Sequence, residues 1–152
     1  RETVDVDLTL LTGFGGEERF IRILLQHFES RIPEAAEFAL ARRVLLLRSR
    51  KGVGLDVALG ALPFEALAVQ RATFFDYPPN IALRTCSAED LLVMKAFAGR
   101  GQDWVDIERI IVRQTGKLDW KYVHTQLRQL AELKEMPEIL DLLERRRVEF
   151  EQ

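Results

Sequence analysis

The sequence contains very little cysteine and histidine: one cysteine, Cys86, and two histidines, His27 and His124. A single cysteine excludes an internal disulfide framework and a cysteine-based zinc cluster, and it is compatible with a reducing cytosol. The two histidines lie far apart in the sequence and form no metal-binding motif. The 24 acidic residues remain, and carboxylate oxygens are the ligands of hard divalent cations. The composition therefore favours oxygen-ligand metal chemistry.

The chain also lacks a long apolar run and an excess of charge of either sign. No run approaches the roughly 20 apolar residues that span a bilayer, and residues 1–5 lack the apolar stretch of a secretory signal. We therefore expect a cytoplasmic protein without a membrane partner. The 22 basic and 24 acidic residues give a net charge of −2, so any binding of nucleic acid must be local. With 47% apolar residues, the chain can bury the core of one domain.

Strand patterns lie in the first part of the chain. Residues 4–10 alternate apolar and polar side chains, which predicts a strand with one buried face and with Asp5, Asp7 and Thr9 on the other. Helical spacing follows at 17–28. The apolar segment 37–48 runs through Arg50-Lys51-Gly52 into a second strand-like segment at 53–59, and these turn residues predict a hairpin.

Helical patterns dominate the rest of the sequence. Ser87, followed three residues later by Asp90, predicts the start of a helix. The predicted helices cover 62–72, 88–98, 103–112, 119–133 and 137–150, with one short strand at 81–85. We expect an α+β (mixed α/β) fold, in which residues 1–86 form a mixed sheet flanked by helices. Residues 87–152 form a helical portion packed on it as one structural unit.

Three aspartates, Asp5, Asp7 and Asp56, are the candidates for metal chemistry. Asp5 and Asp7 lie two apart on a strand, so their side chains share a face with Cα atoms roughly 6 to 7 Å apart. This spacing is equally typical of an exposed edge strand with solvated aspartates. Asp56 lies in an otherwise apolar strand, where its carboxylate must either face solvent or bind a cation, because burying an unpaired charge is unfavourable. Three carboxylates from two strands can hold two Mg²⁺ ions about 4 Å apart for phosphoryl transfer.

Four segments of this sequence occur in the same order as the corresponding motifs of a known group of enzymes. They are Arg1-Glu2-Thr3-Val4-Asp5-Val6-Asp7-Leu8, Leu55-Asp56-Val57, the stretch from Ser87 to Lys95, and the stretch from Ala98 to Ile107. Together they resemble the minimal nucleotidyltransferases of the DNA polymerase β-like superfamily, above all the AbiEii/AbiGii toxin-like branch and its uncharacterised relatives. The resemblance covers residues 1 to about 115 and implies a nucleotidyltransferase-type mixed sheet.

The resemblance also implies roles for individual residues. Asp5 and Asp7 match the paired metal-ligating aspartates, and Asp56 matches the third carboxylate, which helps hold the metal and accepts the proton of the attacking hydroxyl. The residues matched to nucleotide binding are Lys95, which would contact the phosphates, and Asp106, Arg1 and Thr3. The implied reaction transfers a nucleoside monophosphate from an NTP to a hydroxyl with two Mg²⁺ or Mn²⁺ ions. The acceptor would be tRNA, a protein or a small molecule, and an antitoxin protein would be the partner of a toxin.

The sequence departs from this family at its start and leaves alternatives open. The family places a Gly-Ser or Gly-Gly turn about ten residues before the first aspartate, where helix N-terminal amides bind the triphosphate. The sequence begins four residues before Asp5, so we expect this element upstream of Arg1. The alternative is a catalytically inactive interaction or regulatory module of the same fold. Lys95 could instead pair with Glu89 or Asp103, and the basic segment 42–51 could guide a polyanion such as tRNA or form a solvated hairpin.

Overall fold

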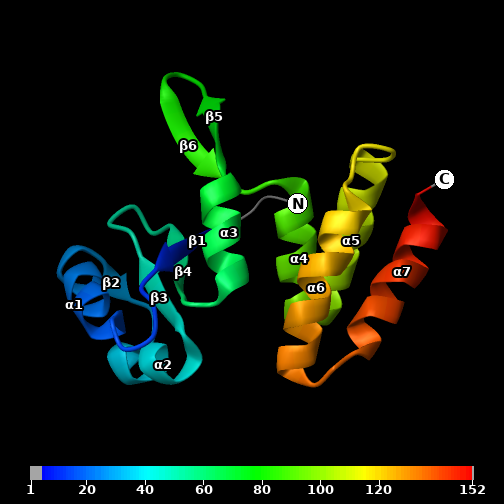
Figure 1. The fold of residues 1–152 in the computed structure, drawn as a ribbon. Coiled ribbons are helices and arrows are strands. Elements are labelled where there is room, and N and C mark those ends of the chain that lie inside the picture. Colours follow the sequence, from blue (N-terminus) through cyan, green and yellow to red (C-terminus); the bar gives the residue numbers. More distant parts are fainter. Residues whose placement is uncertain (1–4, 152) are drawn as a thin grey trace. The chain divides into compact units, whose positions relative to one another are not determined.

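The structure, a computed structural model, describes residues 5–151 and has the α+β fold predicted from the sequence. Arg1 and Thr3, two of the residues predicted to bind the nucleotide, lie outside the described residues. The chain divides into two compact units, residues 1–70 and residues 71–152 (Figure 1). The second unit thus includes residues 71–86, which the sequence pattern grouped with the sheet region. The packing of the helical portion on the sheet stays a prediction.

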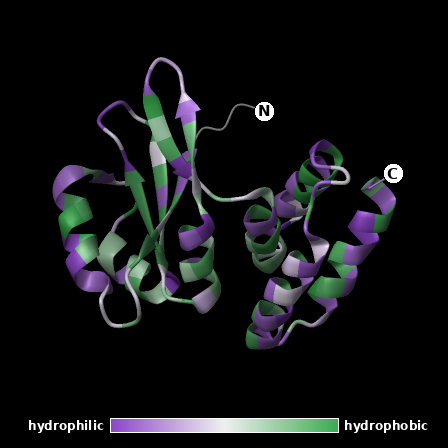
Figure 2. Ribbon diagram, turned by 45° about the horizontal axis from the view of Figure 1, so that its top comes forward, coloured by the Kyte–Doolittle hydropathy of each residue, from purple (hydrophilic) through white to green (hydrophobic). Residues whose placement is uncertain are grey.

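The first unit is built on a four-stranded sheet with the strand order β1-β4-β3-β2. Strand β1 (Asp5–Leu11) pairs in parallel with β4 (Gly54–Gly60). Strand β3 (Val44–Arg48) pairs antiparallel with β4 on one side and with β2 (Glu29–Ser30) on the other. The hairpin predicted around residues 50–52 is therefore confirmed as the β3–β4 connection, and Figure 2 shows the apolar stretches of these strands in green.

Helices α1 (Glu17–His27) and α2 (Ala35–Arg42) supply apolar side chains to the core of this unit. The buried core residues are Ile21, Ala35, Ala39, Leu45, Leu47, Val57 and Leu59. The apolar segment predicted at 37–48 is divided between α2 and β3, because Arg43 ends the helix in the left-handed conformation, with φ of 55°. Helix α3 (Pro63–Arg71) follows β4, and its bounds lie within one residue of the helix predicted at 62–72.

Strand β1 lies at an edge of the sheet, and its apolar face is only partly covered. Leu10 packs against the core, whereas Val6 and Leu8 are 44% and 46% exposed. Helix α1 contacts β2 and α2 contacts β3, the strands farthest from β1 in the sheet order. The prediction of a buried face on this strand is therefore wrong at Val6 and Leu8, because the helices cover this face of the sheet over β2 and β3, at the edge farthest from β1.

The second unit consists of a hairpin followed by four helices. The hairpin pairs β5 (Thr73–Tyr77), which was not predicted, with β6 (Ile81–Thr85). The helices are α4 (Ala88–Ala98), α5 (Gly101–Arg113), α6 (Trp120–Lys134) and α7 (Glu138–Phe150), and their bounds agree with the predictions within two residues. The side chain of Ser87 accepts a hydrogen bond from the backbone N–H of Asp90 at 3.1 Å, which confirms the predicted start of α4.

Apolar contacts among the four helices form the core of the second unit. Helix α4 contacts both α5 and α6, and α7 contacts these same two helices. The fully buried apolar side chains include Leu92, Val93, Ile107, Ile111, Val123, Leu127 and Leu143. None of the helices within residues 5–151 combines the length and the apolar character that a bilayer span requires.

Candidate metal and nucleotide site

The parallel pairing of β1 with β4 places the three predicted aspartates on one face of the sheet. Asp7 lies opposite Asp56 in the register, and Asp5 lies opposite Gly54. Paired residues of neighbouring strands share a face, and so do residues two apart on one strand. The three carboxylates therefore project from the face opposite to the core residues Val57 and Leu59.

One guanidinium, that of Arg31, holds two of these carboxylates. Its Nη1 donates to Oδ2 of Asp5 at 3.2 Å, and its Nη2 donates to Oδ1 of Asp56. The backbone N–H of Arg31 donates to the carbonyl of Leu46 on β3 at 3.0 Å. The side chain thus extends from the β2 side of the sheet to Asp56 on β4 and to Asp5 on β1. Sequence reasoning missed Arg31, because a lone arginine carries no motif.

The absence of a side chain at Gly54 creates the space for the Asp5 carboxylate. A Cβ atom added to Gly54 would lie 2.2 Å from Oδ1 of Asp5 and 3.0 Å from Nη1 of Arg31. Both distances are shorter than ordinary van der Waals contact. The Asp5–Arg31 contact therefore depends on the glycine that faces it across the strand pair. A glycine inside a strand is a signal of such close approach, and it could have been read from the sequence.

The donor atoms of this face suit a hard divalent cation, since Mg²⁺ and Mn²⁺ prefer carboxylate oxygens. Within residues 5–151, however, no group of three or more His, Cys, Asp or Glu side chains is placed to hold a metal ion. The Arg31 guanidinium lies beside Asp5 and Asp56, and Asp7 is exposed to solvent. The residue types thus suit the cation chemically, whereas in this structure the guanidinium of Arg31 occupies two of the three carboxylates.

Arg31 has an unused donor in this position. Its Nε–H is buried and has no hydrogen-bond partner among the described residues. A buried donor without a partner is unfavourable by about 1–3 kcal/mol. The guanidinium therefore has hydrogen-bonding capacity that Asp5 and Asp56 do not satisfy.

Lys95 and Asp106 belong to the second unit and contact each other there. The Nζ of Lys95 donates to Oδ2 of Asp106 at 3.0 Å and to Oδ1 of Asp103 at 3.2 Å. Asp103 is 1% exposed and also accepts from the backbone N–H of Arg100 at 3.1 Å and from its Nε at 2.8 Å. The pairing of Lys95 with Asp103 is the structural alternative that the sequence left open. Its contact with nucleotide phosphates stays a prediction.

The charges of this cluster stabilise one another. Burial alone would lower the pKa of Lys95, but the hydrogen bonds with Asp106 and Asp103 outweigh it and raise the pKa. Burial would raise the pKa of Asp103, but the hydrogen bonds from Arg100 and Lys95 outweigh it and lower the pKa. The hydrogen bond from Lys95 also lowers the pKa of Asp106. All of these groups are charged at neutral pH, so the cluster is unsuited to general acid–base catalysis there.

The basic segment 42–51 has a mixed structure. The side chain of Arg43 donates to Glu17 and to the carbonyls of Gly13 and Leu59, so it ties together the loop after β1, the start of α1 and the end of β4. Four basic side chains of this segment are exposed: Arg42, Arg48, Arg50 and Lys51. They are available to a polyanion, whereas Arg43 is structural.

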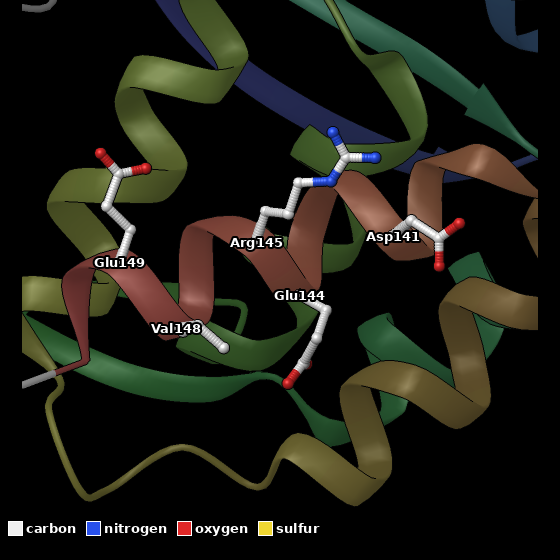
Figure 3. A pocket seen from close by; sticks show the side chains of 5 residues that line it. All are labelled: Asp141, Glu144, Arg145, Val148 and Glu149. Carbon is white, nitrogen blue, oxygen red and sulfur yellow. The ribbon is translucent and has the colours of Figure 1, made fainter.

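A hollow along α7 offers no comparable arrangement. Its lining residues are Asp141, Glu144, Arg145, Val148 and Glu149, and all five project from this one helix (Figure 3). Their charges are mixed and come from successive turns of a single element, so they do not converge on a common point. The aspartate face of the first unit therefore remains the candidate site.

No protein-family model matches the chain, and no curated protein sequence matches it. The resemblance to the nucleotidyltransferases stays a prediction based on the four sequence segments.

Proposed function

We propose that the protein is a nucleotidyltransferase in which Asp5, Asp7 and Asp56 hold Mg²⁺ or Mn²⁺. The register of β1 and β4 is the observation that carries this proposal, because it gathers the three carboxylates on one sheet face. Asp5 and Asp56 lie close enough for one guanidinium to contact both. Carboxylates this close repel one another unless a cation lies between them. A face built in this way suits the binding of cations.

The proposed reaction transfers a nucleoside monophosphate from an NTP to a hydroxyl. The acceptor oxygen forms a bond to the α-phosphorus, and the bond from that phosphorus to the bridging oxygen breaks, so that pyrophosphate leaves with the electron pair. The divalent cation would supply charge neutralisation for the phosphate oxygens. Asp5 and Asp7 would hold it, and Asp56 would also accept the proton of the attacking hydroxyl.

The acceptor proposed first is a hydroxyl of tRNA or of a protein, and a small molecule comes second. The resemblance to the toxin-like branch supports this order, and it also supports an antitoxin partner and a cytoplasmic location. The exposed basic residues Arg42, Arg48, Arg50 and Lys51 support a polyanionic acceptor, because clustered cations attract nucleic acid phosphates.

A second candidate function is a catalytically inactive interaction or regulatory module of the same fold. The observation that favours it is the contact of Arg31 with Asp5 and Asp56. This internal cation neutralises the two carboxylates without any metal, so the aspartates can be retained for stability alone.

Labelling of an acceptor tests the proposal. The full-length gene product is incubated with each labelled NTP, Mg²⁺ and either total tRNA or cell extract. Label should appear on an acceptor, and Asp5→Asn and Asp7→Asn should abolish it because a metal ligand is lost. Asp76→Asn is the matched control, since Asp76 is exposed on the β5–β6 hairpin. If the gene product binds NTP but labels no acceptor in the extract, the result would favour the catalytically inactive interaction or regulatory module.

A further inference from the structure

We propose that Arg31 binds the triphosphate of the substrate, and that its guanidinium moves there when a divalent cation takes the Asp5 and Asp56 carboxylates. This inference rests on the proposed function and assigns the site a residue that no sequence motif indicated. In the absence of metal, the same guanidinium neutralises the two aspartates.

Competition for the same oxygens is the first step. The guanidinium donates to Oδ2 of Asp5 and to Oδ1 of Asp56, which are oxygens that a cation on this face would need. A second positive centre beside these oxygens is repelled by the guanidinium. Binding of metal therefore requires Arg31 to leave, and Arg31 weakens the binding of metal alone.

The backbone of Arg31 keeps the freed side chain beside the site. Its N–H is hydrogen-bonded to the carbonyl of Leu46, whose position on β3 lies directly opposite Asp56. The guanidinium can turn about its side-chain torsions but stays within reach of the aspartate face. In its present position the side chain already contacts Asp5 and Asp56, so the freed guanidinium would stay near an anion bound at these carboxylates.

Phosphate is the anion that this side chain suits best. The planar guanidinium presents five N–H donors in a fork that matches phosphate oxygens, and the buried Nε–H has no partner in the present position. When the cation binds the Asp5 and Asp56 carboxylates, the guanidinium loses these two partners. The triphosphate that arrives with the cation then supplies negative charge for it. Arg31 should therefore oppose the binding of free metal and favour the binding of the metal-bound nucleotide.

These two opposite effects define the experiment. Binding of Mn²⁺ to the full-length gene product is followed by the electron paramagnetic resonance of free Mn²⁺, and binding of NTP at saturating Mn²⁺ is followed by calorimetry. Arg31→Met should bind Mn²⁺ about tenfold more tightly than the parent, because no guanidinium competes for the Asp5 and Asp56 carboxylates. It should bind NTP about tenfold more weakly, because the proposed charge-assisted contact with the triphosphate is lost. Arg31→Lys should lie between the two, because one ammonium lacks the fork of the guanidinium.

Arg22→Met is the matched control. Arg22 is exposed on α1, the helix that packs through Ile21 on the opposite face of the sheet, so the substitution removes a positive charge from the same unit without removing a contact to Asp5 or Asp56. It should change neither affinity by more than about twofold, because an exposed charge is screened by solvent and salt. Circular dichroism checks the fold, and Arg31→Lys takes the place of Arg31→Met if the latter does not fold.

The outcomes separate this inference from the proposed function. If the parent binds both Mn²⁺ and NTP, and the two affinities do not change in opposite directions in the Arg31 variant, the inference fails alone. If the parent binds neither, the proposed function fails and the inference with it. Opposite changes in the Arg31 variant that are absent in Arg22→Met support both the inference and the proposed function.

Discussion

Gly54→Ala should separate the stability of the first unit from its ability to bind a cation. The added Cβ would lie 2.2 Å from Oδ1 and 2.8 Å from Cγ of Asp5, so the carboxylate must move. The side chain of Asp5 is 43% exposed and can turn into solvent. The φ angle of Gly54 lies outside the left-handed region, so alanine introduces no backbone strain there.

The expected change in stability is small because two effects oppose each other. The displaced carboxylate loses its ion pair with Arg31, and pairs of this exposure contribute about 0.2–1 kcal/mol. Alanine is more favourable than glycine inside a strand by about 0.5–1 kcal/mol. The free energy of unfolding should therefore change by less than about 1 kcal/mol. The affinity for Mn²⁺ should fall at least about tenfold, because even the loss of a residue that only hydrogen-bonds to a metal ligand typically weakens metal binding by about that factor.

Urea unfolding followed by circular dichroism measures the free energy of unfolding, and the electron paramagnetic resonance of free Mn²⁺ measures the affinity for Mn²⁺. Gly60→Ala is the control, because Gly60 lies on the same strand and its added Cβ would lie 3.1 Å from the ends of the Leu11 and Thr9 side chains, with no aspartate among its nearest neighbours. It should leave Mn²⁺ binding unchanged. A Gly54→Ala variant that loses more than about 3 kcal/mol would show that Asp5 cannot turn away. Unchanged Mn²⁺ affinity in that variant would remove Asp5 from the ligands.

Three further predictions address the two clusters. Mg²⁺ at 100 times its dissociation constant should stabilise the folded chain by about 2.7 kcal/mol, and Asp56→Asn should reduce the rise in melting temperature; an equal rise in both proteins would contradict the site. Lys95→Met should lower the free energy of unfolding by about 1–3 kcal/mol, because the buried Asp103 loses a partner; a lower NTP affinity in the folded variant would in addition support its predicted phosphate contact. The pKa values of Asp103 and Asp106 are lowered from 3.8, so the unfolded chain binds more protons and stability should fall as the pH drops below about 3.8. Asp106→Asn should flatten that fall in acid-dependent circular dichroism, and an unaltered slope would show that the ion pair with Lys95 contributes little.

The helices of the second unit could be predicted from the sequence because their signals are local. The hydroxyl of Ser87 caps α4 through a residue three positions away, and Gly99 ends the same helix with φ of 68°. Periodic apolar residues located the helices that follow. The β3–β4 hairpin could also be predicted, because short turn segments lie between the strands that they connect. The α+β class and the shared face of Asp5 and Asp7 follow from the same short-range rules.

The arrangement of the aspartate face was decided by tertiary structure. The sequence proposed Asp56 as a partner of Asp5 and Asp7, but only the parallel register of β1 with β4 places Asp7 opposite Asp56. Arg31 reaches two of these carboxylates across the sheet, from a segment without any motif. Such pairings join residues far apart in the chain, and strand order and packing select them rather than local propensity. The sequence by itself thus determined which residues carry the charge, and the tertiary structure decided which charges meet.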